Sequence, residues 1–167
     1  MYSVRLGYNN AVRRINKLIK NNHNSESFVT TVFTIEKTIR RSVTELIISA
    51  GFKSKLARKY VKSLSGQNRL IIQFEFFDPL NRDFDELFTR DLRIKINEWG
   101  TMRNKIVHGE RVYGIDLLKK ATKDALEALE KLKDSLTSHY DYDGWEKLTV
   151  RKKSTLHQKP TIKIHDD

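Results

Sequence analysis

The chain has 167 residues, which is enough for one domain with a substantial buried core. It holds no apolar run near the ~18 residues that a membrane helix needs, and its first residues lack the layout of a signal peptide. The chain has no cysteine, which excludes disulfides and thiolate metal sites. We therefore expect a cytoplasmic protein that does not enter a membrane.

The net charge of +11 is unevenly distributed along the chain. Residues 1–70 carry 14 basic and 3 acidic side chains, residues 71–144 carry 12 and 15, and residues 145–167 carry 6 and 3. A basic N-terminal half attracts polyanions through its long-range field and through counterion release. Basic side chains can also simply solvate the outer faces of amphipathic helices. The segregation of charge favours RNA as a partner.

Few residues interrupt helices, since the chain has two prolines and seven glycines. Apolar spacing predicts a first helix over residues 4–22 and a second over residues 28–50, ended by Gly51. Arg40 and Arg41 lie on the outer face of this second helix and are candidates to bind RNA. Its inward residues step by three and four along the chain: Phe28, Val32, Ile35, Ile39, Val43, Leu46 and Ala50.

Two shorter elements follow. Ser54 can cap a third helix that ends at about Gly66. Residues 69–77 fit a helix through Leu70, Phe74 and Phe77 and fit a strand through alternate apolar residues. We favour the helix because the surrounding chain is helical.

A long helix is predicted over residues 83–108, and a final helix begins at Ile115. The first has an apolar stripe of Phe88, Leu92, Ile96, Trp99, Met102 and Ile106, and the second of Ile115, Leu118, Ala125, Leu129, Leu132 and Leu136. The sequence therefore predicts an all-α bundle of about five to six helices over residues 1–144. Residues 145–167 form a basic tail, which can be a strand pair, a partner-binding arm or disordered.

Three polar side chains converge at the end of the long predicted helix. Asn104 and His108 are four residues apart and share one face, and Arg103 adjoins that face. Metal-independent RNA cleavage needs a base, an acid and a cation that stabilises the phosphorane. Histidine suits the proton transfers and the arginine fork suits the phosphate. One histidine does not easily act as both acid and base, so a two-fold dimer would complete the site.

The same residues also fit a purely structural interpretation. Helix C-termini favour basic residues, and glycine commonly follows the last turn, which would explain Arg103, Lys105, His108 and Gly109 without catalysis. Lys105 is also a possible supporting residue of the site. Glu36 lies among the inward positions of the second helix. It can pair with Arg103 or Arg40 in a dimer cleft, or it can reach solvent, which we favour slightly.

The sequence Arg-Asn-Lys-Ile-Val-His of residues 103–108 resembles the Arg-Asn-x-x-x-His motif of the HEPN superfamily. The setting is similar too: a small all-α domain, a motif that closes the penultimate long helix, a glycine after the histidine, and one last long helix. The resemblance covers about residues 1–144. It implies a dimeric endoribonuclease that needs no metal or other cofactor and has its motif at the dimer cleft.

Carried over by position, the resemblance implies that Arg103 polarises the phosphate, that His108 is the acid or base, and that Asn104 shapes the site. The implied products carry cyclic 2′,3′-phosphate ends. The implied setting is defence or a toxin–antitoxin pair, with an antitoxin or regulatory protein as a further partner. One toxin branch carries tyrosine two residues after the histidine, where this chain has Glu110, so we do not expect that pairing. The alternative is a non-catalytic HEPN-like module that binds RNA or protein.

Overall fold

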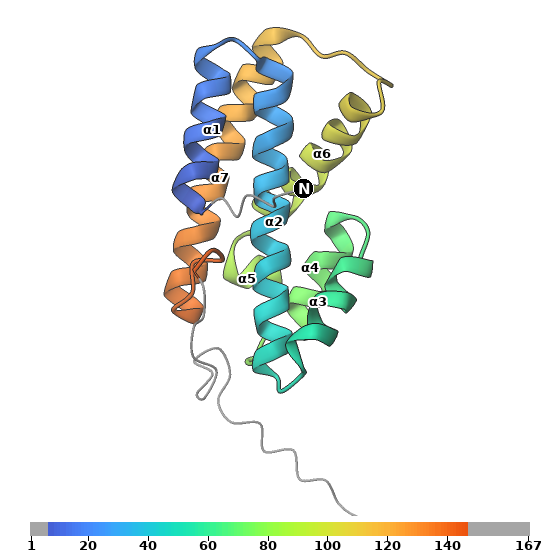
Figure 1. The fold of residues 1–167 in the computed structure, drawn as a ribbon, viewed down its shortest axis with the longest axis vertical. Helices are drawn as coiled ribbons and strands as arrows, with labels where there is room; N and C mark the ends of the chain where they lie inside the picture. Colours follow the sequence, from blue (N-terminus) through green and yellow to red (C-terminus); the bar gives the residue numbers. More distant parts are fainter. Residues whose placement is uncertain (1–6, 147–167) are drawn as a thin grey trace, which may run out of the picture.

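The computed structural model describes residues 7–146, and in this range the chain forms seven α-helices and no strand (Figure 1). The helices are α1 (Tyr8–Lys20), α2 (Asn24–Ser49), α3 (Ser54–Ser63), α4 (Gln67–Phe76), α5 (Phe84–Leu87), α6 (Arg90–Val107) and α7 (Ile115–Tyr140). The predicted all-α fold is confirmed. Residues 4–6 of the first predicted helix and residues 147–167 of the predicted tail lie outside the described residues. None of the helices in residues 7–146 is long and apolar enough to cross a bilayer.

The long helix α2 forms the centre of the fold. It contacts α1 and α7 on one side and α3, α4 and α6 on the other, as Figure 1 shows. With neighbours on both sides, α2 buries more than one apolar stripe, and serine and threonine fill other inward positions. Their hydroxyls donate to main-chain carbonyls one turn earlier, at 2.7 Å from Thr31 to Ser27 and at 2.8 Å from Thr38 to Thr34. These buried hydroxyls therefore need no partner on another helix.

The predicted long helix over residues 83–108 is wrong in one respect, because it breaks into α5 and α6 at Phe88 and Thr89. Thr89 has a φ of 148°, and its Oγ1 accepts a hydrogen bond from the amide of Leu92 at 3.2 Å, which caps α6. The rings of Phe84 and Phe88 both pack against Phe74, with centroids 5.9 and 5.6 Å away. The break lets α5 turn these rings into the core, and it explains the higher helix count. The ambiguous stretch at residues 69–77 lies in α4 as far as Phe76, so the favoured helix is confirmed.

A buried carboxylate joins the end of α4 to the end of α7. Asp78 is 3% exposed and accepts hydrogen bonds from Tyr140 Oη at 2.6 Å and from Arg82 Nη2 at 2.9 Å. The amides of Leu80 and Arg82 donate to it as well, both at 3.0 Å. Burial alone would raise the pKa of Asp78, but these donors together hold the pKa below its usual range. The carboxylate therefore remains ionised in the folded protein.

The segment after α7 packs back onto α2. Trp145 is buried, and its indole Nε1 donates to Thr38 Oγ1 at 2.9 Å. Arg41 donates to the carbonyls of Gly144 and Trp145, both at 2.6 Å. Trp145 falls in the predicted tail, yet it belongs to the packed body of the protein.

Candidate functional site at the end of α6

The end of α6 is closed by a Schellman motif. The last helical residue is Val107, and Gly109 follows the C-cap with a φ of 69°. The amide of Gly109 donates to the carbonyl of Ile106 at 3.1 Å, and the amide of Glu110 donates to that of Lys105 at 2.8 Å. A left-handed residue is required at this position, so glycine fits it. The structural interpretation thus accounts for Gly109 and leaves the side chains of the motif to be explained.

Asn104 and His108 are exposed on the same face of α6. The amide of His108 donates to the carbonyl of Asn104 at 2.9 Å, so the helical spacing holds through the C-cap. Within residues 7–146, neither side chain forms a hydrogen bond or an ion pair. An amide and an imidazole are therefore both available to a ligand at this end of the helix.

Arg103 turns in the other direction, towards α2. Its Nη2 lies 2.9 Å from Glu36 Oε2, and its guanidinium lies 4.7 Å from the centre of the Phe33 ring. The side chain is 14% exposed, and its Nε is buried without a hydrogen-bond partner. Its Nη1 forms no hydrogen bond in the described chain and is not buried. One nitrogen of the fork therefore remains free for an external acceptor.

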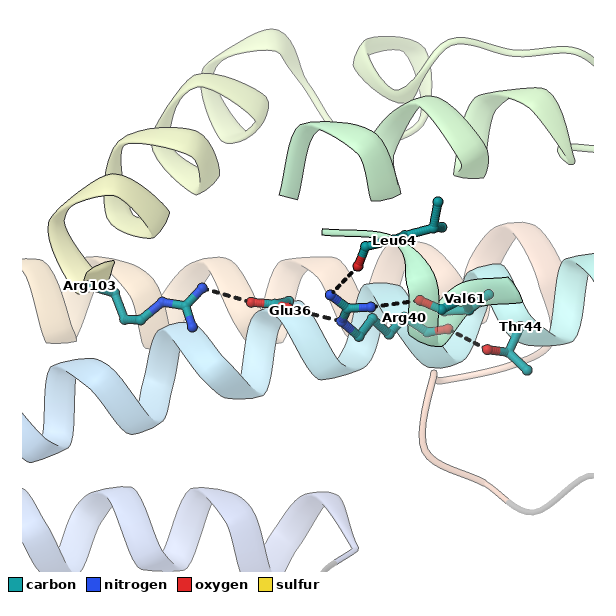
Figure 2. A network of polar contacts seen from close by, with 6 residues as sticks. All are labelled: Glu36, Arg40, Thr44, Val61, Leu64 and Arg103. Atoms are coloured by element: carbon teal, nitrogen blue, oxygen red, sulfur yellow. Dashed lines mark hydrogen bonds and ion pairs between the residues drawn. The ribbon is translucent and has the colours of Figure 1, made fainter. Parts of the chain in front are cut away.

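Glu36 connects Arg103 to Arg40 (Figure 2). Its Oε1 accepts from Arg40 Nε at 2.9 Å, and its side chain is 11% exposed. Arg40 in turn donates to the carbonyls of Val61 at 2.8 Å and Leu64 at 2.9 Å, at the end of α3. The favoured interpretation of Glu36, that it reaches solvent, is wrong. The alternative pairing with Arg103 and Arg40 is observed, and it forms within one chain.

The two predicted RNA-binding arginines both have partners inside the chain. Arg40 is directed at Glu36 and at the end of α3, and Arg41 is directed at the carbonyls of Gly144 and Trp145. Both therefore hold the fold together in this structure. Lys105 is half-buried and forms no ion pair among the described residues.

The structure brings together Arg103, Glu36 and Arg40, and it leaves Asn104 and His108 open to solvent beside them. Phe33, under the guanidinium of Arg103, was missed from the sequence. Its signal is its position three residues before Glu36, on the same face of the helix. The described residues hold no group of three or more potential metal-binding side chains. The site thus offers one imidazole, one amide and one partly engaged guanidinium per chain.

Comparison of the chain with protein-family models, with curated proteins and with solved structures finds no match in any of the three. The interpretation of the site therefore depends on residues 103–108 and on the side chains around them.

Proposed function

We propose that the protein is a metal-independent endoribonuclease of HEPN type, whose active site is shared between two copies of the chain. The observation that carries this proposal is the exposed imidazole of His108, which lies one turn from Asn104 and close in sequence to a partly engaged Arg103. These groups are the ones that cleavage of RNA by its own 2′-hydroxyl requires.

In the proposed reaction, one His108 takes the proton of the ribose 2′-hydroxyl, and the 2′-oxygen attacks the adjacent phosphorus. The bond from phosphorus to the 5′-oxygen breaks, and His108 of the partner subunit, as the acid, protonates that oxygen. The products are a cyclic 2′,3′-phosphate and a free 5′-hydroxyl. Two imidazoles are needed because the base and the acid act on opposite sides of the phosphorus.

Arg103 suits the role of the phosphate-binding cation. The carboxylate of Glu36 holds one side of its guanidinium, and Nη1 remains free to donate to a phosphate oxygen. Arg40, Glu36 and Arg103 together carry a net charge of +1, so the network keeps a positive charge at the site. A cation held in place before the substrate arrives stabilises the developing negative charge without reorganising.

Exposed apolar side chains around this end of the molecule support a dimer. Phe33 is 52% exposed, Val107 56% and Val112 95%. Ile115 and Leu117, at the start of α7, are 58% and 52% exposed. Burial of these side chains against a second copy would favour a dimer through the hydrophobic effect. A two-fold contact here would bring the two motifs together.

The cellular setting follows from the resemblance alone. We place the protein in the cytoplasm, in a defence or toxin–antitoxin system, with an antitoxin or regulatory protein as its controlling partner.

The test is RNA cleavage by the purified protein in excess chelator. We expect cyclic 2′,3′-phosphate ends from the wild type and a loss of about 100-fold or more in rate for His108→Ala. His23→Ala is the matched control, because His23 is exposed and lies outside the site. Equal cleavage by wild type and His108→Ala would overturn the proposal, as would a failure of the wild type to cut any of a broad panel of RNAs.

A second function is favoured by one observation. Arg103 is bound to Glu36 and Gly109 closes the helix, so both residues have structural roles. A non-catalytic module that binds RNA or protein would keep these features. RNA binding that weakens steeply with salt, without any strand scission, would select it.

A further inference from the structure

A long stretch around α3 has no negative charge. Between Glu45 and Glu75 the chain carries no acidic residue. It carries six basic residues there, and all of them are exposed: Lys53, Lys55, Arg58, Lys59, Lys62 and Arg69. Positive charge of this density without acids in the sequence attracts a polyanion.

The fold arranges four of these residues as a stripe. Lys55, Arg58, Lys59 and Lys62 follow the spacing i, i+3, i+4 and i+7, which places them on one face of α3. The opposite face is buried through Ala57 and Val61. The stripe extends over roughly 10 Å, because a helix rises about 1.5 Å per residue.

Two acidic residues on the neighbouring helices α2 and α4 are engaged elsewhere. Glu75 pairs with Arg93 at 2.9 Å, and Glu36 lies between Arg40 and Arg103. Within residues 7–146, the basic side chains of the stripe form no ion pair. The charge of the stripe is therefore not neutralised by ion pairs within residues 7–146.

The other basic helix, α1, differs in its surroundings. It lies beside α7 in Figure 1, and burial, followed by the nearby carboxylates of Glu130 and Asp134, raises the pKa of Tyr8. Carboxylates of α7 thus lie near Tyr8 at the start of α1, as does Lys133, whose Nζ is 4.9 Å from the centre of the Tyr8 ring. Among its large apolar side chains only Ile19 is exposed, and α1 has no exposed aromatic ring in residues 8–20. The surface of α3 is the better candidate for a nucleic acid.

Exposed rings occur on α3, just before it and at the end of α4. Tyr60 is 41% exposed on α3, and its hydroxyl donates to Gln73 Oε1 at 2.5 Å, which fixes the ring. Phe52 and Phe76 are 53% and 73% exposed, and both pack edge-on against Phe77. A surface that binds single-stranded nucleic acid combines two features: cationic side chains that contact the phosphates and aromatic rings that stack on the bases. The bases of a duplex already stack on one another and gain less from such rings.

We propose that the basic stripe of α3 and the neighbouring rings bind single-stranded RNA and lead it to the site at the end of α6. The choice of RNA rests on the proposed function. Arg40 connects the two places, because it binds the carbonyls of Val61 and Leu64 and shares Glu36 with Arg103. The end of α3 is thereby fixed relative to Arg103. An anionic membrane fits less well, because the inner face of α3 is already packed in the core.

The first test measures binding of a labelled 2′-O-methyl single strand, which has no free 2′-hydroxyl and is not cut. We compare wild type with the triple variant Lys55→Gln, Lys59→Gln, Lys62→Gln. We expect binding about tenfold weaker or more, and a log–log salt slope shallower by about 2, since each phosphate contact adds about 0.7. The matched control is Arg13→Gln, Arg14→Gln, Lys17→Gln on α1, which changes the net charge equally and should stay within about threefold. Equal losses in both variants would overturn the proposal.

The second test uses Tyr60→Ala, with Tyr60→Phe as its control and circular dichroism to confirm folding. Tyr60→Ala should weaken single-strand binding about fivefold or more and leave duplex binding nearly unchanged, while Tyr60→Phe keeps the ring and the binding. Binding to phosphatidylserine vesicles that depends on the same residues, without binding to the oligonucleotide, would also overturn the proposal.

The two proposals fail separately. If α3 variants lose binding and the wild type cuts no RNA, the nuclease proposal fails and the surface stands. If His108→Ala abolishes cleavage and α3 variants bind RNA normally, the surface fails and the nuclease stands.

Discussion

Glu36 and Arg103 form the contact that joins the central helix to the candidate site, with Oε2 and Nη2 2.9 Å apart and both side chains largely buried. The other carboxylate oxygen of Glu36 binds Arg40 at the same distance. One carboxylate thus separates two guanidinium groups that would otherwise repel each other. The network has a structural role and, in our proposal, a functional one.

Replacing Glu36 tests the structural role. Glu36→Ala leaves two poorly solvated cations without their shared partner, so we expect the free energy of unfolding to fall by about 3 kcal/mol. The measurement is denaturant unfolding with an unchanged m-value. Glu26→Ala removes an exposed carboxylate and should change stability by less than about 1 kcal/mol. A similar small effect for Glu36→Ala would contradict the network.

Arg103→Lys separates charge from geometry. Lysine keeps the positive charge but lacks the planar fork that can hold Glu36 on one side and donate to a phosphate on the other. We expect stability within about 1.5 kcal/mol of wild type and a cleavage rate lower by about 100-fold or more. Initial rates in excess chelator measure the effect. Full activity in this variant would show that a point charge is sufficient.

Asp78 makes stability depend on pH at the acidic end. Its pKa is held below the usual range, so the stability that it contributes is present above the unfolded value of about 3.9 and is lost as the pH falls through the folded pKa. Unfolding measured from pH 6 to pH 2 should show this loss in the wild type. Asp78→Asn should be less stable at pH 6 and decline less towards pH 2. Parallel curves would rule out Asp78 as a source of the dependence.

Tyr142 makes stability depend on pH at the alkaline end of the range. Burial raises its pKa to about 12, whereas an unfolded tyrosine has a pKa near 10. The raised pKa means that its contribution is complete below pH ~10 and is lost as the pH rises through about 12. Unfolding between pH 9 and pH 12 should therefore be flatter for Tyr142→Phe than for wild type. Early ionisation of Tyr142 in an ultraviolet titration would refute the assignment.

Gly144 allows the chain after α7 to approach α2. Its φ is 82°, and a Cβ there would lie 2.8 Å from Thr38 Cγ2. We expect Gly144→Ala to reduce stability by about 2 kcal/mol, and Thr38→Ser to recover part of this loss, since it removes the methyl and keeps the hydroxyl. Gly7→Ala is the control, because Gly7 has open space around it and an ordinary φ. Thermal unfolding is compared among the wild type, Gly144→Ala, Gly144→Ala combined with Thr38→Ser, and Gly7→Ala. An unchanged stability of Gly144→Ala would contradict the close approach of the two segments.

Apolar spacing predicted one buried stripe of α2 correctly, from Phe28 to Leu46, and missed the buried serines and threonines of its other inward positions. The second helix ends within one residue of its predicted end. The break at Thr89 was missed because Phe88 fits the apolar stripe of an unbroken helix equally well. Arg103 and Arg40 were possible partners of Glu36 from the sequence, but nothing local decided between pairing and solvent, because Arg103 lies 67 residues further along the chain. Local periodicity predicts the face on which a residue lies. It does not predict which groups the end of a long side chain such as Arg41 contacts.

The motif was found from spacing and residue type, and the structure adds the direction in which each side chain points. Asn104 and His108 reach solvent, as a helical face predicts. Arg103 turns inward because a carboxylate and a ring on α2 attract it more than water does. That choice depends on tertiary packing, so the sequence alone was not sufficient to predict it.

The buried hydroxyls of α2 have one further consequence. Because each donates within its own helix, these positions present mainly methyl and methylene groups to their neighbours, and only Thr38 among the four also accepts from another segment, from Trp145 Nε1. Adjacent helices can tolerate small sliding movements along such a surface. Residues 36–41 behave differently, since they bind α6, the end of α3 and the segment after α7 within two turns. Substitutions in this short stretch would therefore weaken the contacts of α2 with three separate parts of the molecule at once. These contacts fix how the other helices are oriented relative to α2.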